Sequence, residues 1–325
     1  MKLLITGGTG FFGKALLRHF QRLPAARAPF AEVWVLSRDP STFLAAYPEF
    51  DGLDWLRFTQ GDTSDAATLP RGQGFTHVLH AATDSTKGPQ LSPLQHYDQI
   101  VQGTRHLLDY ALHCGAQRFL LTSSGAVYGP QPAALEALAE DHAGSPDSMQ
   151  PAQAYGMGKR AAEHLCALYT QAHGLETVVA RCFAFVGPDL PLDVHFAIGN
   201  FIRDALWAEA ITVHGDGTPL RSYLDQSDLA PWLLAMLHQG RSGQAYNLGS
   251  DQAISIADLA HLVRDTLAPH KPVHIRGQAQ PGAARNRYIP SVAKAQRELG
   301  LQVHKPLRQA IIDTAAAQLH RTQRL

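Results

Sequence analysis

A glycine-rich turn near the N-terminus constrains the fold of this chain more than any other feature. The apolar run Lys2–Thr6 leads directly into Gly7-Gly8-Thr9-Gly10-Phe11-Phe12-Gly13, and a helical pattern follows. Glycines at this spacing permit a tight turn, a close approach of the backbone to a pyrophosphate, and close packing of the helix on the strand. Because the turn lies between a strand and a helix, it predicts a dinucleotide-binding site.

Short apolar runs alternate with amphipathic segments through the first half of the chain, which is typical of βαβ units and a parallel sheet. We therefore expect an α/β fold, a doubly wound Rossmann sheet with a smaller mixed α/β C-terminal lobe. Strands are predicted at Lys2–Thr6, Glu32–Leu36, Leu56–Gln60, His77–His80, Arg118–Thr122 and Thr177–Arg181. Helices are predicted at Phe12–Arg22, Ser41–Tyr47, Leu94–His113 and Gln153–His173.

The alternation weakens after Gly187-Pro188, which predicts a domain boundary there. Residues 1–187 are expected to form the dinucleotide-binding domain and residues 188–325 mainly a substrate-binding lobe, with a segment near 211–250 crossing back. Helices are predicted at Phe196–Glu209, Leu229–His238, Ile256–Leu267, Val292–Leu299 and Leu307–Arg321, with short strands at Ile211–His214 and Ala245–Leu248. The segment Pro130–Pro151 is predicted to be an exposed loop.

Charge and composition argue against several classes of partner. The chain has 28 Lys and Arg against 28 Asp and Glu, so it lacks the basic excess that favours nucleic-acid binding. Its three cysteines, Cys114, Cys166 and Cys182, lack metal-ligand spacing and are typical of buried thiols in a reducing compartment. The sequence shows neither a signal-peptide pattern nor a long apolar span. We expect a cytoplasmic protein without a metal, nucleic-acid or membrane partner.

The end of the second predicted strand indicates which dinucleotide binds. NAD sites usually place Asp or Glu there, whereas an Arg accommodates the 2′-phosphate of NADP. Ser37 and Arg38 occupy this position and Asp39 follows, which favours NADP over NAD. The alternative is that Arg38 is a solvated surface charge and Asp39 caps the next helix. Asp62, after the third strand, is placed either to bind the adenine amine or to cap a turn.

Tyr155 and Lys159 lie four residues apart in a helical pattern, so they share one face of the helix. An adjacent ammonium and the positive nicotinamide of an oxidised cofactor lower the pKa of a phenol, which lets Tyr155 move a proton as a hydride moves. Ser123 and Ser124 follow a predicted strand and supply a hydroxyl for the reacting oxygen. Alone, a Tyr-x-x-x-Lys pair is usually a surface pair.

The order of the motifs resembles that of the extended short-chain dehydrogenase/reductase family, the NAD(P)-dependent epimerases, dehydratases and reductases of nucleotide sugars. After the glycine-rich turn come His80-Ala81-Ala82, Ser123-Ser124-Gly125-Ala126-Val127-Tyr128-Gly129, Tyr155-Gly156-Met157-Gly158-Lys159 and Arg181-Cys182-Phe183-Ala184-Phe185-Val186-Gly187-Pro188. The likeness continues to Leu299-Gly300 and so covers nearly the whole chain. It is specific to the family and much less so to a substrate.

The resemblance implies a role for each member of a Ser-Tyr-Lys set. Tyr155 is the expected catalytic acid/base, Lys159 lowers its pKa and binds the nicotinamide ribose, and Ser124 hydrogen-bonds the substrate oxygen. The implied cofactor-binding residues are Gly7, Gly10, Phe11, Phe12, Gly13, Ser37, Arg38, Asp62, Thr63, Ala81, Ala82, Tyr155 and Lys159.

The resemblance also implies a nucleotide-sugar site formed by Thr83, Ser123, Ser124, His195, Arg221 and Arg285. Arg221 is expected to contact the diphosphate, which suits a forked guanidinium; its alternative role is a salt bridge with Asp225 or Asp228. For His195 the alternative is a packed or surface side chain. Family members often dimerise through two helices, here Leu94–His113 and Gln153–His173, so a homodimer is expected.

Two reactions fit these residues. Sugar 4,6-dehydratases of the family carry an Asp-Glu pair directly after the active-site hydroxyl, and this chain has Gly125-Ala126 there, which disfavours dehydration. We favour an NADPH-dependent reductase of a 4-keto nucleotide sugar, because Arg38 indicates NADP. The alternative is a nucleotide-sugar 4-epimerase with transient oxidation at C4. A third hypothesis is a non-catalytic dinucleotide-sensing protein, against which the complete Ser-Tyr-Lys set argues.

Overall fold

The centre of the molecule is a seven-stranded parallel sheet. The structure, a computed structural model, describes residues 1–24, 26, 28–83, 90–280, 282 and 285–322. The strand order is β11-β6-β5-β4-β1-β2-β3, which confirms the expected doubly wound α/β fold. The strands are β1 (Lys2–Thr6), β2 (Glu32–Ser37), β3 (Leu56–Gln60), β4 (His77–His80), β5 (Arg118–Ser124), β6 (Glu176–Cys182) and β11 (Gln244–Leu248).

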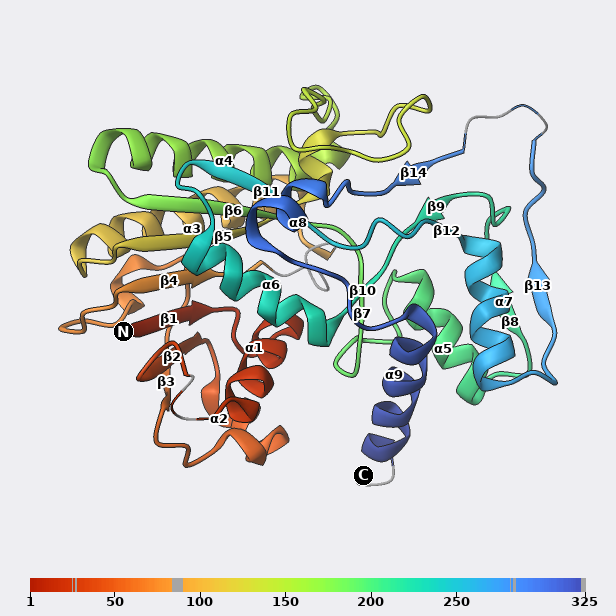
Figure 1. Ribbon diagram of the computed structural model, residues 1–325, viewed down its shortest axis with the longest axis horizontal. Helices are drawn as coiled ribbons and strands as arrows, with labels where there is room; N and C mark the ends of the chain where they lie inside the picture. The colour runs from red at the N-terminus through yellow and green to blue at the C-terminus, as the bar shows by residue number, and fades with distance from the viewer. Residues whose placement is uncertain (25, 27, 84–89, 281, 283–284, 323–325) are drawn as a thin grey trace.

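Helices cover both faces of this sheet. In Figure 1, α1 (Phe11–Arg22) and α6 (Gln226–Gln239) lie in front of the sheet, and α3 (Pro93–His113) and α4 (Ala154–His173) lie on the opposite side. The short α2 (Pro40–Ala46) follows β2. Along β1, Leu3 and Ile5 pack in the core on the α1 and α6 side, and Leu4 packs in the core on the α3 and α4 side. Burial on both faces explains why these strands are continuous apolar runs.

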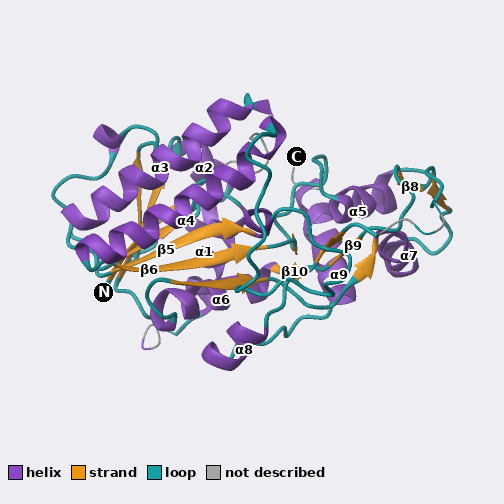
Figure 2. Ribbon diagram, turned by 90° about the horizontal axis from the view of Figure 1, so that it is seen from above, coloured by secondary structure: helices purple, strands orange, loops and turns teal. Residues whose placement is uncertain are grey.

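A smaller lobe lies beyond the carboxyl ends of the sheet strands, as Figure 2 shows. It has its own apolar core, built largely from α5 (Ala197–Trp207), α7 (Ile256–Leu267) and α9 (Leu307–Thr322). Its short strands form three small sheets: β7 (Phe185–Val186) with β10 (Leu224–Asp225), β8 (Ile211–Val213) with β13 (Val273–Ile275), and β9 (Leu220–Arg221) between β12 (Ile254–Ser255) and β14 (Arg287–Tyr288). The last remaining helix is α8 (Ala293–Leu299), and 3₁₀ turns occur at Pro48–Phe50, Ala66–Thr68, Gly125–Tyr128 and Pro151–Gln153.

The predicted elements are close to the observed ones, and the differences have tertiary causes. Strand β5 runs two residues further than expected, to Ser124, because Ser123 and Ser124 pair with Arg181 and Cys182 of β6. The segment 130–151 is not wholly exposed, since Leu138 is fully buried and bridges to Pro290. The later segment β11 pairs with β6 at the edge of the main sheet. The domain boundary near residue 187 and the homodimer stay predictions.

Among the residues that the structure describes, every helix is too short or too polar to cross a bilayer.

Two buried histidines of β4 make the stability of this fold depend on pH. Burial lowers the pKa of His77 from 6.5 to about 4 and that of His80 to about 3. The unfolded chain binds protons at both rings below about pH 6.5 whereas the folded chain does not, so the free energy of unfolding falls as the pH drops through this window. We expect a lower urea midpoint near pH 5 than near pH 7.5, with a slope of up to about 1.4 kcal/mol per pH unit for each histidine.

A His77→Phe variant tests the origin of this slope. His77 packs against the rings of Phe30 and His238, so phenylalanine keeps the aromatic contacts and removes the titrating group. The variant should lose less stability than the wild type between these two pH values. Equal losses in both proteins would contradict the assignment to His77.

Candidate active site

A cavity of about 1410 Å³ lies at the carboxyl ends of the sheet strands, where a doubly wound sheet binds its ligands. It brings together residues from both lobes that are far apart in the sequence. The predicted site residues that line it are Gly7, Gly10, Phe11, Phe12, Ser37, Arg38, Asp62, Thr63, Ala81, Ala82, Thr83, Ser123, Ser124, Tyr155, Lys159, His195 and Arg221. Gly13 and Arg285 are not in this lining; Arg285 is exposed.

The glycine-rich turn is built for close backbone contacts. Gly7 has a φ of 73°, and a Cβ there would lie 2.5 Å from the backbone oxygen of Ala81. Gly13 packs against the turn instead of lining the cavity, because a Cβ added at this position would lie 2.1 Å from the backbone of Gly8. Gly10 caps α1 without a side chain, so the first-turn N–H groups are left for a ligand. These features fit the pyrophosphate of a dinucleotide.

The side chains after β2 and β3 bear on the alternatives that the sequence left open, and Arg38 among them is exposed. Asp39 caps α2, since its carboxylate accepts hydrogen bonds from Thr42 N (3.0 Å), Thr42 Oγ1 (2.6 Å) and Ser41 Oγ (2.8 Å). The Thr42 bonds contribute most to lowering the pKa of Asp39 to about 2. Asp62 lines the cavity, but its Oδ1 also accepts hydrogen bonds from Ser64 N and Oγ. Arg38 lines the cavity and acts electrostatically on Asp62.

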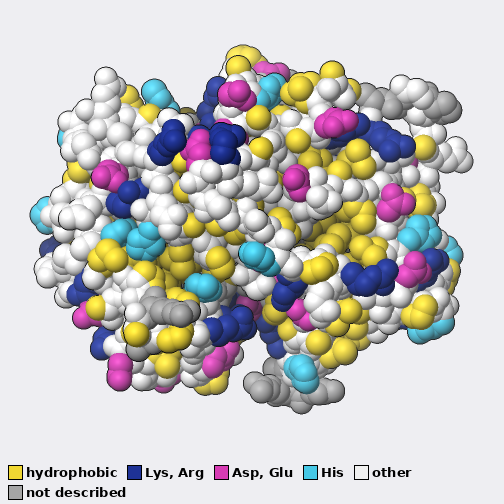
Figure 3. Space-filling model, viewed as in Figure 1, with side chains coloured by type: hydrophobic (Ala, Val, Ile, Leu, Met, Phe, Trp, Pro, Cys, Tyr) yellow, Lys and Arg dark blue, Asp and Glu magenta, His cyan; other side chains and the backbone are white. Residues whose placement is uncertain are grey.

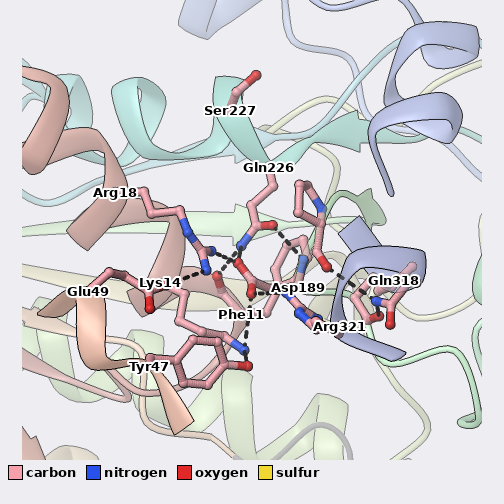
Figure 4. A network of polar contacts seen from close by, with 12 residues as sticks. Phe11, Lys14, Arg18, Tyr47, Glu49, Asp189, Gln226, Ser227, Gln318 and Arg321 are labelled. Atoms are coloured by element: carbon pink, nitrogen blue, oxygen red, sulfur yellow. Dashed lines mark hydrogen bonds and ion pairs between the residues drawn. The ribbon is translucent and has the colours of Figure 1, made fainter. Parts of the chain in front are cut away.

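A buried carboxylate ties the glycine-rich turn to the C-terminal lobe. Asp189, three residues after the end of β7, has a fully buried side chain that pairs with Lys14 and Arg18 of α1 and with Arg321 of α9 (Figure 4). Gln226 of α6 donates to Asp189 (3.0 Å) and to the backbone oxygen of Phe11 (2.8 Å), the first residue of α1.

Three cations therefore surround this one carboxylate at the wall of the cavity. The pKa of Asp189 is lowered because the charges of Lys14, Arg18 and Arg321 outweigh the burial that would raise it. In Figure 3, Lys and Arg atoms lie on both sides of the notch between the α1 and α9 regions. The sequence offered no motif for this cluster, since its members come from four separate segments.

The predicted Ser-Tyr-Lys set lies on α4 and at the end of β5. Lys159 is buried, and its Nζ donates to Thr83 Oγ1 (2.7 Å) and to the backbone oxygen of Thr122 (2.8 Å). Burial lowers the pKa of Lys159 to about 8. Ser124 and Tyr155 both line the cavity, and Ser124 Oγ also accepts a hydrogen bond from Ala126 N (3.2 Å).

The groups of the protein itself raise the pKa of Tyr155, and the lowering expected from a bound oxidised nicotinamide stays a prediction. Burial of the hydroxyl raises it to about 12, and a hydrogen bond with Ser124 opposes this rise without cancelling it. The Lys159 ammonium makes its hydrogen bonds to Thr83 and Thr122 rather than to the phenol. The Tyr155 hydroxyl is therefore protonated at neutral pH.

The structure distinguishes the two serines that follow β5. Ser123 Oγ donates to Glu163 Oε1 at 2.5 Å, so its hydroxyl is already committed to the protein. Ser124 Oγ is the hydroxyl that lies with Tyr155 at the cavity. Ser124 is therefore the better candidate for holding a reacting oxygen.

A second phenol at the reaction centre was not found from the sequence. Tyr288 OH lies 3.4 Å from Ser124 Oγ and 3.4 Å from the backbone oxygen of Cys182, and burial raises its pKa. It follows Ser124 by 164 positions, so no local spacing could connect them. A Cβ at Gly125 would lie 2.7 Å from both Tyr288 OH and Phe183 Cζ. The packing therefore leaves no room for a side chain at position 125.

The C-terminal lobe supplies the far end of the cavity. Arg221 lines it from β9, with Nη1 donating to the backbone oxygen of Leu220 (2.8 Å). The alternative salt bridge is not formed, because Asp225 pairs with Lys305 (3.4 Å) and Asp228 accepts from the backbone N–H groups of residues 304 and 305. His195 also lines the cavity, with its ring 4.3 Å from that of Phe196.

Comparisons with known proteins agree with this architecture. The model of the NAD dependent epimerase/dehydratase family matches residues 3–249. UDP-glucuronic acid decarboxylase 1 of Danio rerio is 32% identical over 96% of this chain and 71% of its own length. The dTDP-glucose 4,6-dehydratase DesIV of Streptomyces venezuelae, solved with NAD and TYD, is 25% identical with a TM-score of 0.84, covering 99% of this chain and 98% of its own. RMD of Pseudomonas aeruginosa, solved with NADPH, is 25% identical with a TM-score of 0.79, covering 98% and 99%.

The Asp189 cluster generates a stability prediction. An Asp189→Asn variant leaves Lys14, Arg18 and Arg321 around a neutral amide, and breaking a buried ion pair costs about 3–5 kcal/mol. Because Arg18 and Arg321 keep some contact with water, we expect a loss of at least about 2 kcal/mol in the free energy of unfolding. Urea denaturation measures it.

The matched control is Asp313→Asn. Its carboxylate is one-third exposed and pairs with Lys305 at 2.6 Å, so the change should cost less than about 1 kcal/mol. Similar losses in the free energy of unfolding of the two variants would show that the buried Asp189 ion pairs stabilise the fold no more than an exposed ion pair does.

Proposed function

The chain belongs to the NAD dependent epimerase/dehydratase family, and on that premise we propose that it is an NADPH-dependent reductase of a 4-keto nucleotide sugar. The observation that supports this proposal most is that Arg38, after β2, lines the same cavity as Tyr155 and Ser124. Reduction of a ketone needs a group that gives a proton to the oxygen, and a phenol with a pKa near 12 holds that proton at neutral pH.

The chain's own side chains account for the proton and for the position of the oxygen. A bound nicotinamide dinucleotide supplies the hydride, which adds to the carbonyl carbon. Ser124 donates a hydrogen bond to the carbonyl oxygen, and Tyr155 transfers its proton to that oxygen to give the alcohol. The Lys159 ammonium, four residues along the same face of α4, stabilises the phenolate that remains, which then regains a proton from solvent. Each step uses groups that line the cavity.

The surroundings of Ser124 support hydride chemistry without elimination. Positions 125 and 126 are Gly and Ala, so this turn offers no carboxylate to remove or return a proton at a neighbouring carbon. Tyr288 and Phe183 fill the space that a side chain at 125 would need. Tyr288 stays neutral because burial raises its pKa, so it does not replace that missing base.

The cofactor part of the proposal depends on the side chains after β2. Asp39 also lines the cavity, but its carboxylate is occupied by capping α2. Arg38 lines the cavity next to it, and an arginine there suits a 2′-phosphate. RMD, a structural neighbour, was solved with NADPH. For the substrate, Arg221 in the far wall is suited to the diphosphate of a nucleotide sugar.

The test is turnover of the purified protein with NADPH and a panel of UDP-, dTDP- and GDP-linked 4-keto-6-deoxyhexoses. Loss of NADPH absorbance in step with formation of the alcohol supports the proposal. Interconversion of UDP-glucose and UDP-galactose without NADPH loss would identify a 4-epimerase, and carbon dioxide release from UDP-glucuronic acid would identify a decarboxylase. Dinucleotide binding without turnover of any of these sugars would favour a sensing protein.

Tyr155→Phe should abolish turnover and leave dinucleotide binding within about threefold of the wild type, because only the proton-carrying oxygen is lost. Turnover on the panel and fluorescence titration with NADPH measure the two properties. Near-normal turnover would refute the role of Tyr155.

Arg38→Ala should weaken NADPH binding much more than NADH binding. A hydrogen bond to a charged group contributes about 1.5–3 kcal/mol, so we expect at least about a tenfold loss for NADPH. Equal weakening of both dinucleotides would remove the argument for NADP.

A further inference from the structure

Helix α4 carries a third polar side chain in line with Tyr155 and Lys159. Glu163 follows Lys159 by four residues, so the three side chains form one stripe along the helix. With a rise of about 1.5 Å per residue, Glu163 lies about 12 Å along the axis from Tyr155. It is therefore too far away to touch a substrate held by that phenol, and any effect on the reaction has to pass through other residues.

One carboxylate joins α4 to two neighbouring strands. Glu163 Oε1 accepts from Ser123 Oγ at 2.5 Å, and its two oxygens accept from Arg181 Nε (3.1 and 3.2 Å) and from Arg181 Nη2 (2.8 Å). Ser123 of β5 and Arg181 of β6 are direct partners in the sheet register. Only 11% of the Glu163 side chain is exposed, and fork-shaped Arg–carboxylate contacts of this kind are strong and directional.

The same carboxylate acts on the charge of Lys159. The groups around that ammonium are the Cys166 and Cys182 thiols, the His80 ring and Glu163. Burial raises the pKa of both thiols and lowers that of His80 to about 3, so all three are neutral near pH 7. Glu163 is the group in this set that opposes the effect of burial on Lys159 with a full negative charge.

Arg181 and its neighbours complete the surroundings of Glu163. Arg181 also donates to Tyr128 OH (2.9 Å) and to the backbone oxygen of Glu140 (3.1 Å). Burial raises the pKa of Tyr128 to about 12, so this phenol is neutral. Loss of the Glu163 charge would thus leave Arg181 as an unpaired cation behind the reaction centre.

We propose that Glu163 is a positioning residue that docks α4 on β5 and β6 and keeps the Lys159 ammonium charged next to the reaction centre. The docking sets the gap between Tyr155 on the helix and Ser124 at the end of β5. The charge matters where Lys159 meets the dinucleotide and where it stabilises the phenolate. This inference rests on the proposed function, because it assigns Lys159 to a bound nicotinamide ribose.

The test is NADPH affinity, measured by fluorescence from about pH 6.5 to about pH 9.5, which brackets the Lys159 pKa. Wild-type affinity should fall as the pH rises through about 8, where Lys159 loses its proton. Glu163→Gln keeps the shape and removes the charge, which lowers the pKa of Lys159 further. Its midpoint should lie at least about half a pH unit lower, with about threefold weaker binding above it.

Two control variants separate the effect of the Glu163 charge from the effect of docking α4 and from a general loss of structure. Ser123→Ala keeps the Glu163 charge and its Arg181 contacts, so its midpoint should equal that of the wild type. Glu176→Gln breaks the ion pair with Arg118 (2.7 Å) at the other end of the same two strands, and it should match the wild type throughout.

A double variant tests the inference if Glu163→Gln alone does not fold. Glu163→Gln combined with Arg181→Gln leaves no unpaired cation and should shift the midpoint in the same direction by a smaller amount, because the positive charge of Arg181 is removed as well. Two results would overturn the inference and leave the proposed function intact. One is that folded Glu163→Gln, alone or combined with Arg181→Gln, has the same midpoint as the wild-type protein. The other is that the NADPH affinity of the wild-type protein does not depend on pH. Failure of the wild-type protein to bind either NADPH or NADH would instead refute the proposed function and, with it, this inference.

Discussion

The packing of α4 against the ends of β5 and β6 determines where the reactive side chains of this protein lie. Gly156 permits the close approach to the turn after β5, because a Cβ there would lie 2.8 Å from the backbone oxygen of Ala126. Gly158 permits close packing on α3, because a Cβ there would lie 3.3 Å from Ile100. Lys159 then reaches the backbone of Thr122 at 2.8 Å. The helix thus brings a phenol and an ammonium to a strand end that already carries Ser124.

Burial at this centre acts in opposite directions on the two titrating groups. It raises the pKa of Tyr155 to about 12 and lowers that of Lys159 to about 8, because a desolvated site disfavours both the phenolate and the ammonium. The proton therefore stays on the phenol near neutral pH, and the lysine keeps its charge by a small margin. A hydrogen bond with Ser124 opposes the rise in the pKa of Tyr155, and the charge of Glu163 opposes the fall in the pKa of Lys159.

The C-terminal lobe is joined to this centre by a few strong contacts. Asp189 connects α1 with α9, and Gln226 connects it to the first residue of the dinucleotide-binding helix. Strand β14 brings Tyr288 next to Ser124, and its partner β9 brings Arg221 to the same cavity. The cavity is therefore formed by both lobes, and the two ends of a ligand within it would be held by different parts of the chain.

The sequence by itself determined the alternating α/β order, the glycine-rich turn and the Tyr155–Lys159 pair, because each depends on residues that are close together in the chain. Spacing along a strand or helix dictates which side chains share a face, and glycines permit backbone contacts that other residues forbid. Tertiary structure alone decided that Tyr288 lies beside Ser124, that Ser123 donates its hydroxyl to Glu163, and that Asp189 pairs with three cations. It also decided the protonation of Tyr155, because a pKa depends on burial and on charges from segments that meet only in the folded chain.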